Sequence, residues 1–141
     1  MIEYFDAPDI KEKLKDIVEL LRFHHVDMER LLCVRSTGSQ SRGAIARIHG
    51  LGRIWQHAMK CKPTYIIEVL SERFDELNIE QQNWTLIHEL LHIPKNFGGG
   101  FLHHKNYVNK ENVEIWYRRY RQKIEEIDEA SQTRRNLQDI D

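Results

Sequence analysis

Residues 78–105 have the sequence NIEQQNWTLIHELLHIPKNFGGGFLHHK, which contains an H-E-x-x-H segment at positions 88–92. Residues four apart lie on the same face of an α-helix, so His88 and His92 can bind one metal ion. Glu89 follows the first histidine, where a carboxylate can take a proton from a water molecule at the metal. The segment therefore predicts a metal site on a helix, with Glu89 as its general base.

The bounds of this helix are also encoded locally. Asn78 is a favourable cap, and Gln81 three residues later completes a capping-box pattern. Pro94 disfavours helical geometry at the residue before it, so the helix should stop just after the second histidine. The sequence predicts an active-site helix over about residues 78–93, with an apolar stripe formed by Trp84, Ile87 and Leu91.

The segment after the helix supplies candidates for a third ligand. Three glycines at 98–100 predict a turn, and His103 and His104 follow it. Catalytic zinc sites take three protein ligands and keep a fourth position for water. Side chains alternate in an extended segment, so His103 and His104 should not bind the same ion. The spacing alone leaves both as candidates.

Composition limits the wider possibilities. The 141 residues are 40% hydrophobic and 30% charged with a net charge of −1, which is typical of one globular domain and not of a dedicated nucleic-acid binder. No apolar run approaches the roughly 18 residues of a membrane span. The N-terminus lacks the features of a signal peptide, so we expect a cytoplasmic protein. Cys33 and Cys61 form no C-x-x-C pair and are expected to be reduced.

Hydrophobic spacing outlines the remaining elements. It predicts helices over residues 9–23, 51–59 and 110–127, and strands over 30–35, 44–49 and 65–70. Asp9, with Glu12 three residues later, predicts a capping box for the first helix. The strand at 44–49 is expected to pair with the strand at 30–35, and residues 71–77 are expected to form a connector.

These elements together predict an α+β fold with a small mixed or antiparallel sheet packed on helices and a long C-terminal helix. One domain is expected over residues 1–129, followed by a polar, frayed tail at 130–141. The four histidines outside the motif segment are expected to be structural, namely His24, His25, His49 and His57.

Residues 46–105 resemble a phage and archaeal metallopeptidase family. The matching pieces are ARIHGLGRIWQ, PTYIIEV and HELLHIPKNFGGGFLHHK, starting at residues 46, 63 and 88. In that family HELLHIP is followed by an aromatic residue, a glycine pair and a histidine just before a basic residue. The resemblance implies a minimal zincin-like domain that binds zinc, and places the third ligand at His104, before Lys105. The chain is more distantly similar to the SprT-type zinc proteases.

The leading hypothesis is a zinc-dependent peptidase acting on a peptide or protein substrate. Zinc would lower the pKa of water and polarise the scissile carbonyl, while Glu89 would act as general base and then as general acid. His103, Tyr107 and, more remotely, Tyr117 are candidates to stabilise the oxyanion. The apolar strand at 65–70 is expected to pair with an extended substrate.

Two other hypotheses remain open. A zinc hydrolase of nucleic acid or small amides is suggested by a basic segment interleaved with aromatics, which contains Arg118, Arg119, Arg121 and Lys123. The same pattern is also typical of the solvated face of an amphipathic helix. A non-catalytic interaction module with structural zinc would need a fourth ligand, for which Cys33 or Cys61 are candidates.

Overall fold

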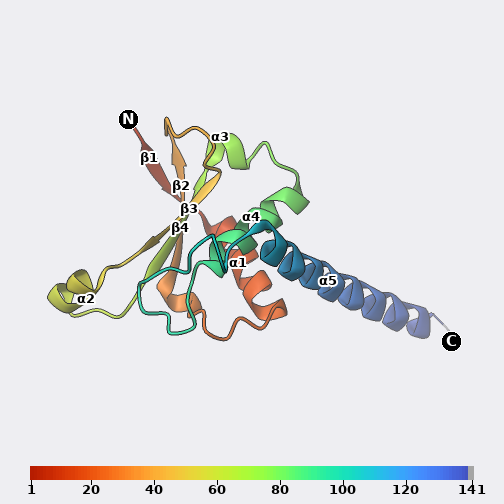
Figure 1. Ribbon diagram of the computed structural model, residues 1–141. Coiled ribbons are helices and arrows are strands. Elements are labelled where there is room, and N and C mark those ends of the chain that lie inside the picture. Colours follow the sequence, from red (N-terminus) through yellow and green to blue (C-terminus); the bar gives the residue numbers. More distant parts are fainter. Residues whose placement is uncertain (140–141) are drawn as a thin grey trace.

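A four-stranded mixed sheet forms the centre of the protein in the computed structural model, which describes residues 1–139 (Figure 1). The strands are β1 (Glu3–Asp6), β2 (Leu31–Thr37), β3 (Ala46–Gly50) and β4 (Tyr65–Leu70), in the spatial order β1-β2-β4-β3. The central pair, β2 and β4, is parallel, and each outer strand is antiparallel to its neighbour. The predicted α+β class with a mixed sheet is confirmed.

The position of β4 corrects two expectations. The strand at 44–49 was expected to pair with β2, but β3 pairs with β4, and Ile67 of β4 lies opposite both Ile48 and Cys33. Because β4 is the most apolar strand and is largely buried, it takes the central position. Its backbone is hydrogen-bonded on both sides, so β4 cannot receive a substrate strand. β1 and β3 are the two edge strands of the sheet, and each has one unpaired edge among the described residues.

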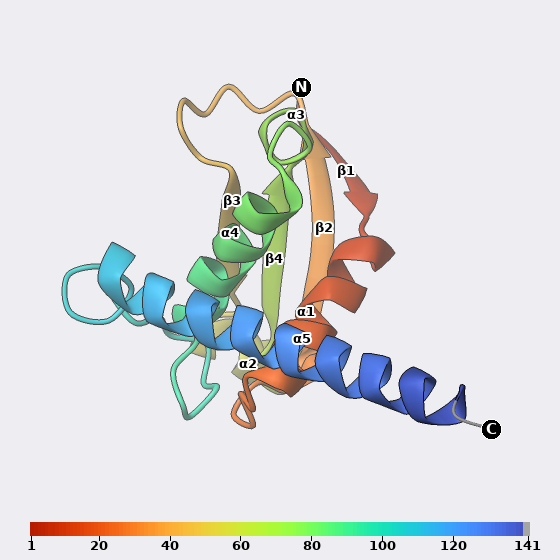
Figure 2. The same cartoon turned by 90° about the vertical axis from the view of Figure 1, so that its right-hand side faces the viewer.

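Three helices cover one face of the sheet, as Figure 2 shows. They are α1 (Pro8–Leu20), α4 (Ile79–Leu91) and α5 (Lys110–Gln138). α1 and α4 contact the sheet, and α5 packs against these two helices. Together they form one core that includes Ile10, Leu14, Ile17, Leu31, Ile67, Leu86, Leu90 and Val113. Three short elements lie in the connections: η1 (Met28–Arg30), α2 (Arg53–Met59) and α3 (Ser71–Phe74).

The N-terminal region differs from the prediction in two respects. β1 was not predicted, because its four residues are exposed and carry no clear apolar alternation. The capping box at Asp9 is also wrong, since Ala7 is the cap of α1 and makes no side-chain hydrogen bond there. The Asp9 carboxylate instead accepts a hydrogen bond from Arg35 at 2.6 Å, which links α1 to β2.

The last helix is longer than its apolar spacing predicted. α5 continues to Gln138, well past Ile127, because the polar residues that follow are compatible with a helix. Its buried residues are Val113, Tyr117 and Tyr120, all in the first half. The second half projects away from the other elements (Figures 1 and 2). Residues 140–141 of the predicted tail lie outside the described residues.

Candidate metal centre

The helix that carries the H-E-x-x-H segment has the predicted cap at its N-terminus and ends close to the second histidine, as expected. Asn78 Oδ1 accepts a hydrogen bond from the Gln81 backbone N–H at 2.8 Å, and Gln81 Oε1 accepts from the Asn78 N–H at 3.1 Å. The capping box is therefore confirmed. α4 ends at Leu91, and His92 is its C-cap with helical backbone angles, φ −70° and ψ −16°. His92 thus still lies one turn beyond His88.

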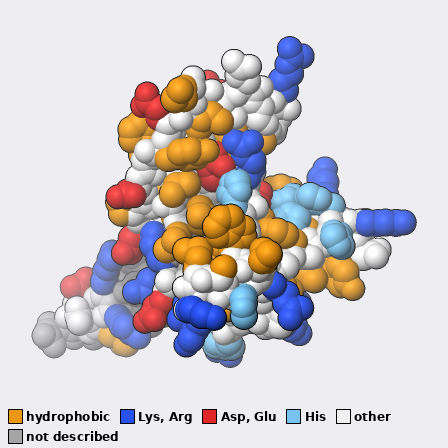
Figure 3. Space-filling view, turned by 90° about the vertical axis from the view of Figure 1, so that its left-hand side faces the viewer, with side chains coloured by type: hydrophobic (Ala, Val, Ile, Leu, Met, Phe, Trp, Pro, Cys, Tyr) orange, Lys and Arg blue, Asp and Glu red, His pale blue; other side chains and the backbone are white. Residues whose placement is uncertain are grey.

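Three histidines meet at the C-terminal end of α4. The candidate ligand nitrogens of His88, His92 and His104 all lie within 4.8 Å of one another. Their ring centroids are 5.2 Å apart for His88–His92, 5.4 Å for His88–His104 and 4.5 Å for His92–His104. The space-filling view shows several histidine side chains on the surface, some of them close together on the right of the view and others at its lower edge (Figure 3). The structure therefore brings together all three predicted metal ligands.

The backbone around Leu102 orients His92 and holds the returning chain. The Leu102 N–H donates to the His92 carbonyl at 2.8 Å, and His92 Nδ1 donates to the Leu102 carbonyl at the same distance. Because a carbonyl can only accept, His92 Nδ1 carries the proton and Nε2 keeps its lone pair. A hydrogen bond of this kind is the usual support for a metal-binding histidine.

The glycine turn is anchored by two side chains that sequence reasoning missed. The Tyr65 hydroxyl donates to the Gly100 carbonyl at 2.7 Å and accepts from the Gly99 N–H at 2.8 Å. Gln56 donates to the Leu51 and Gly98 carbonyls at 2.7 and 3.1 Å. Gly99 has a φ of +102°, and a Cβ there would lie 2.5 Å from the Leu51 carbonyl oxygen. No local pattern marks these partners, because they are distant in sequence.

Burial gives the site unusual protonation preferences. Burial, followed by the neighbouring His92 and His104, lowers the pKa of His88 to about 4. Burial also lowers the pKa of His92. Both rings are therefore neutral at pH 7 and able to donate a lone pair to a metal ion. Burial raises the pKa of Glu89 to about 8, and this side chain is only 7% exposed.

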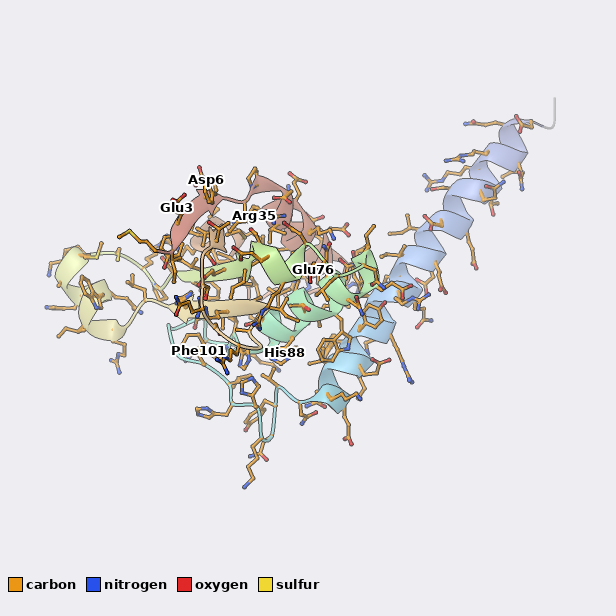
Figure 4. All side chains as sticks on the ribbon, turned by 90° about the horizontal axis from the view of Figure 1, so that it is seen from above. Glu3, Asp6, Arg35, Glu76, His88 and Phe101 are labelled. Atoms are coloured by element: carbon orange, nitrogen blue, oxygen red, sulfur yellow. The ribbon has the colours of Figure 1, made fainter. Side chains whose placement is uncertain are left out.

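A cavity of about 420 Å³ opens over the three histidines. Residues 46–48 of β3 and residues 101–104 of the returning chain both line it. Glu89 lines the cavity together with His88 and His92, so its carboxylate faces the same space as the candidate ligands. Figure 4 shows His88 on α4 and Phe101 on the returning chain facing this region. A molecule in the cavity would contact the histidines, Glu89 and the unpaired edge of β3.

The three candidates to stabilise the oxyanion differ in their access to this cavity. His103 lines it beside His104. Tyr107 is 54% exposed and is not among the described residues that line it. Tyr117 lines a second cavity, beside the N-terminal half of α4. His103 is therefore the candidate oxyanion stabiliser with the most direct access to the site.

Residues invoked by the other hypotheses do not join the cluster. Cys33 and Cys61 are free thiols, and within residues 1–139 the cluster consists of the three histidines alone. The predicted structural histidines are also outside it, and His49 instead contacts Glu68 at 2.8 Å.

The basic residues of α5 have partners of their own. Arg118 pairs with Glu114 at 3.1 Å, Arg121 lies 3.8 Å from Glu80, and Lys123 lies 3.8 Å from Glu126. The Arg119 guanidinium lies 4.6 Å from the centroid of the Trp116 ring. These contacts fit the solvated face of an amphipathic helix better than a continuous free basic surface.

Three imidazole side chains suit a divalent ion that accepts nitrogen ligands. The fold and the site thus define a small α+β protein with a three-histidine metal-binding site beside a buried glutamate. Its family is shown by comparison, because the model of the family described as "Putative phage metallopeptidase" matches residues 2–139. The chain belongs to this family, and the match extends beyond residues 46–105. Neither the curated proteins nor the solved structures gave a significant match.

Proposed function

We propose that this protein is a zinc-dependent peptidase that hydrolyses peptide bonds in an extended substrate. The observation that carries the proposal is the convergence of His88, His92 and His104 in a cavity that Glu89 also lines. The family match supports a metallopeptidase in general terms. The choice of zinc and the mechanism are part of the proposal.

The three histidines would hold the metal through neutral ring nitrogens. A zinc ion there would supply Lewis-acid polarisation of the substrate carbonyl and a lowered pKa for water. A structural site is usually closed by a fourth protein ligand, often cysteine. Because the described cluster contains only three candidate ligands, the site is better suited to catalysis than to structural zinc.

Glu89 would move the proton during hydrolysis. Its carboxyl lies in the cavity wall and is shielded from solvent, which raises its pKa to about 8 without a cation. A nearby cation favours the ionised form of a carboxylate, so a metal ion at the histidines would lower the pKa of Glu89 below about 8. Glu89 could then accept a proton from the attacking water and give it to the leaving amine.

The unpaired edge of β3 would bind the substrate backbone. β3 is antiparallel to β4 on one side, and its other edge borders the cavity at Ala46, Arg47 and Ile48. An extended peptide can add to such an edge through backbone hydrogen bonds. His103, which also lines the cavity, would donate a hydrogen bond to the oxyanion of the transition state.

The decisive experiment combines metal analysis with a single substitution. Purified protein should contain one zinc per chain and should cleave an unfolded protein such as reduced casein. Glu89→Gln should retain zinc and lose activity by at least about a hundredfold, the usual contribution of a general base. Glu76→Gln is the matched control, because Glu76 is exposed and lies before the start of α4, whereas Glu89 lies near its end.

A wild-type protein without stoichiometric zinc would contradict the proposal. So would hydrolysis that persists in Glu89→Gln, since the activity would then come from a contaminant or from another site.

A further inference from the structure

A second cavity lies beside the N-terminal half of α4. It has a volume of about 370 Å³, and four of its seven lining residues are the apolar or aromatic side chains of Ile45, Leu77, Trp84 and Tyr117. These residues come from four different parts of the chain: the segment before β3, the connector before α4, α4 itself and α5. A pocket of this volume can accommodate one large apolar side chain.

This pocket is joined to the metal site by an intermediate depression of about 230 Å³. The depression shares Ala46, His88 and Glu89 with the metal cavity. It shares Ile45, Trp84 and Thr85 with the apolar pocket. The Trp84 ring centroid is 5.9 Å from that of His88. The three spaces therefore form one cleft that follows α4 and the edge of β3.

Several polar groups of the pocket already have partners, which favours an apolar occupant over a basic one. The Trp84 Nε1–H donates to Glu114 at 3.3 Å, which fixes the indole ring. The Glu80 carboxylate lies 3.8 Å from the Arg121 guanidinium. Thr85 Oγ1 donates to the Gln81 carbonyl at 2.9 Å. A bound Lys or Arg would have to compete with Arg121 for Glu80, whereas an apolar side chain needs no new polar partner.

The geometry of the cleft indicates which substrate residue reaches the pocket. A peptide added antiparallel to β3 would run from the Gly50 end towards Ile45, so its C-terminal part would pass the pocket. Trp84 lies one helical turn from His88, about 5.4 Å along the axis, and an extended chain advances about 3.3 Å per residue. One of the two residues after the scissile bond would therefore place its side chain in the pocket.

We propose that this pocket selects substrates with a large apolar or aromatic side chain, such as Leu or Phe, at one of the two positions after the scissile bond. This inference rests on the proposed peptidase function. It predicts that a fully buried large side chain is preferred over Ala by about ten- to hundredfold.

The test uses the zinc-loaded full chain and a set of decapeptides in which the two positions after a fixed residue are each Ala, Leu, Phe, Lys or Glu. Cleavage sites and rates are measured by mass spectrometry. In parallel, calorimetry measures the binding of the same peptides to Glu89→Gln, so that the preference is also tested without hydrolysis.

Thr85→Phe tests the pocket directly. The new ring should fill the space next to Trp84 and reduce the preference for Leu or Phe over Ala by about tenfold or more. The zinc content of the variant should stay unchanged, because Thr85 is not a ligand. Thr133→Phe is the matched control, since Thr133 is exposed on the projecting part of α5. Leu77→Ala, which shortens one wall without altering either helix, is the second variant if Thr85→Phe does not fold.

The outcomes separate the two proposals. Cleavage with no apolar preference, or with a preference that both pocket variants retain, overturns the pocket and leaves the peptidase. Preferential binding of Phe peptides that Thr85→Phe abolishes, with no cleavage by wild type, supports an apolar binding pocket but overturns the peptidase and, with it, the placement of the pocket after a scissile bond. Neither cleavage nor preferential binding overturns both.

Discussion

Adjacent histidines at 103 and 104 have different surroundings. Both line the cavity, but only His104 joins the cluster with His88 and His92. The backbone carbonyl of His103 accepts hydrogen bonds from the Tyr107 and Val108 N–H groups at 3.3 and 3.1 Å. If His104 is the third ligand, His104→Ala should weaken zinc binding by more than about a hundredfold, beyond the usual loss for a supporting residue. His103→Ala should bind zinc like wild type and lose activity. Competition with a chromogenic chelator measures both affinities, and zinc loss in His103→Ala alone would reverse the assignment.

Glu68 is a buried carboxylate on the face of β4 away from the helices. Burial alone would raise its pKa, but hydrogen bonds from Arg47, Ser36 and His49 outweigh this and lower the pKa to about 2, from an ordinary value of 4.5. A carboxyl with a lowered folded-state pKa stabilises the fold above its ordinary pKa, and this stabilisation is lost as pH falls towards 2.

Glu68→Gln should therefore lower the free energy of unfolding at pH 7 by on the order of 3 kcal/mol. The difference from wild type should shrink as pH falls from 5 to 2. Urea unfolding at several pH values measures this. The exposed Glu76→Gln should show no such trend, and a constant difference for Glu68→Gln would show that the loss is only one of packing.

Cys33 should react slowly with thiol reagents in the folded protein. Burial raises the pKa of the Cys33 thiol to about 11, and thiolates rather than thiols react with alkylating reagents. We expect Cys33 to resist iodoacetamide at pH 7.5 in the folded protein and to react after denaturation. Mass spectrometry of timed samples would show this, and rapid labelling of Cys33 in the folded state would contradict the burial that the structure describes.

At the scale of elements, the turn at 98–100 determines where His104 lies. Gly99→Ala introduces a Cβ at a positive φ and 2.5 Å from the Leu51 carbonyl oxygen, which should cost about 1–3 kcal/mol. Because this turn carries the chain back to the cluster, zinc affinity should fall as well. Gly100→Ala is the matched control, since a Cβ there meets no atom within 4 Å. Thermal unfolding with and without zinc checks both, and equal behaviour of the two variants would contradict the role of Gly99.

The elements also show what local patterns can predict. α4 was predicted with its capping box and its histidine pair, because caps and i, i+4 spacing involve neighbours in sequence. The pairing of β3 with β4 was not predicted, because strand order depends on which strand buries both faces. The contacts of Tyr65 with Gly99 and Gly100, and of Glu68 with Ser36, likewise join residues more than thirty positions apart.

For the molecule as a whole, α5 consists of a packed half and a projecting half. Tyr120 is 5% exposed, and its hydroxyl donates to Asp16 at 2.8 Å. From residue 130 to 139 the described side chains are exposed apart from the half-buried Ser131. Deleting residues 130–141 should change the free energy of unfolding by less than about 0.5 kcal/mol, as expected for exposed positions. Deletion from Tyr120 onwards should destabilise the protein strongly. Urea unfolding of both proteins tests the predicted domain boundary at residue 129, which a large loss in the shorter deletion would contradict.

The helices can also be compared with the length and apolarity that a membrane span requires. Among the helices in residues 1–139, none is both long enough and apolar enough to cross a bilayer. α5 is long but polar over most of its surface, so its length does not make it a membrane-spanning helix.

The unpaired edge of β3 also bears on aggregation. An open strand edge can pair with the edge of another sheet, and proteins usually shorten or charge such edges to prevent this. β3 has only five residues, carries Arg47 and His49, and leads through Gly50 into the α2 excursion. A sheet of another molecule would therefore form few backbone hydrogen bonds with this short strand. A single flexible peptide could still pair with the same edge. The short strand thus limits self-association while it leaves the cleft accessible.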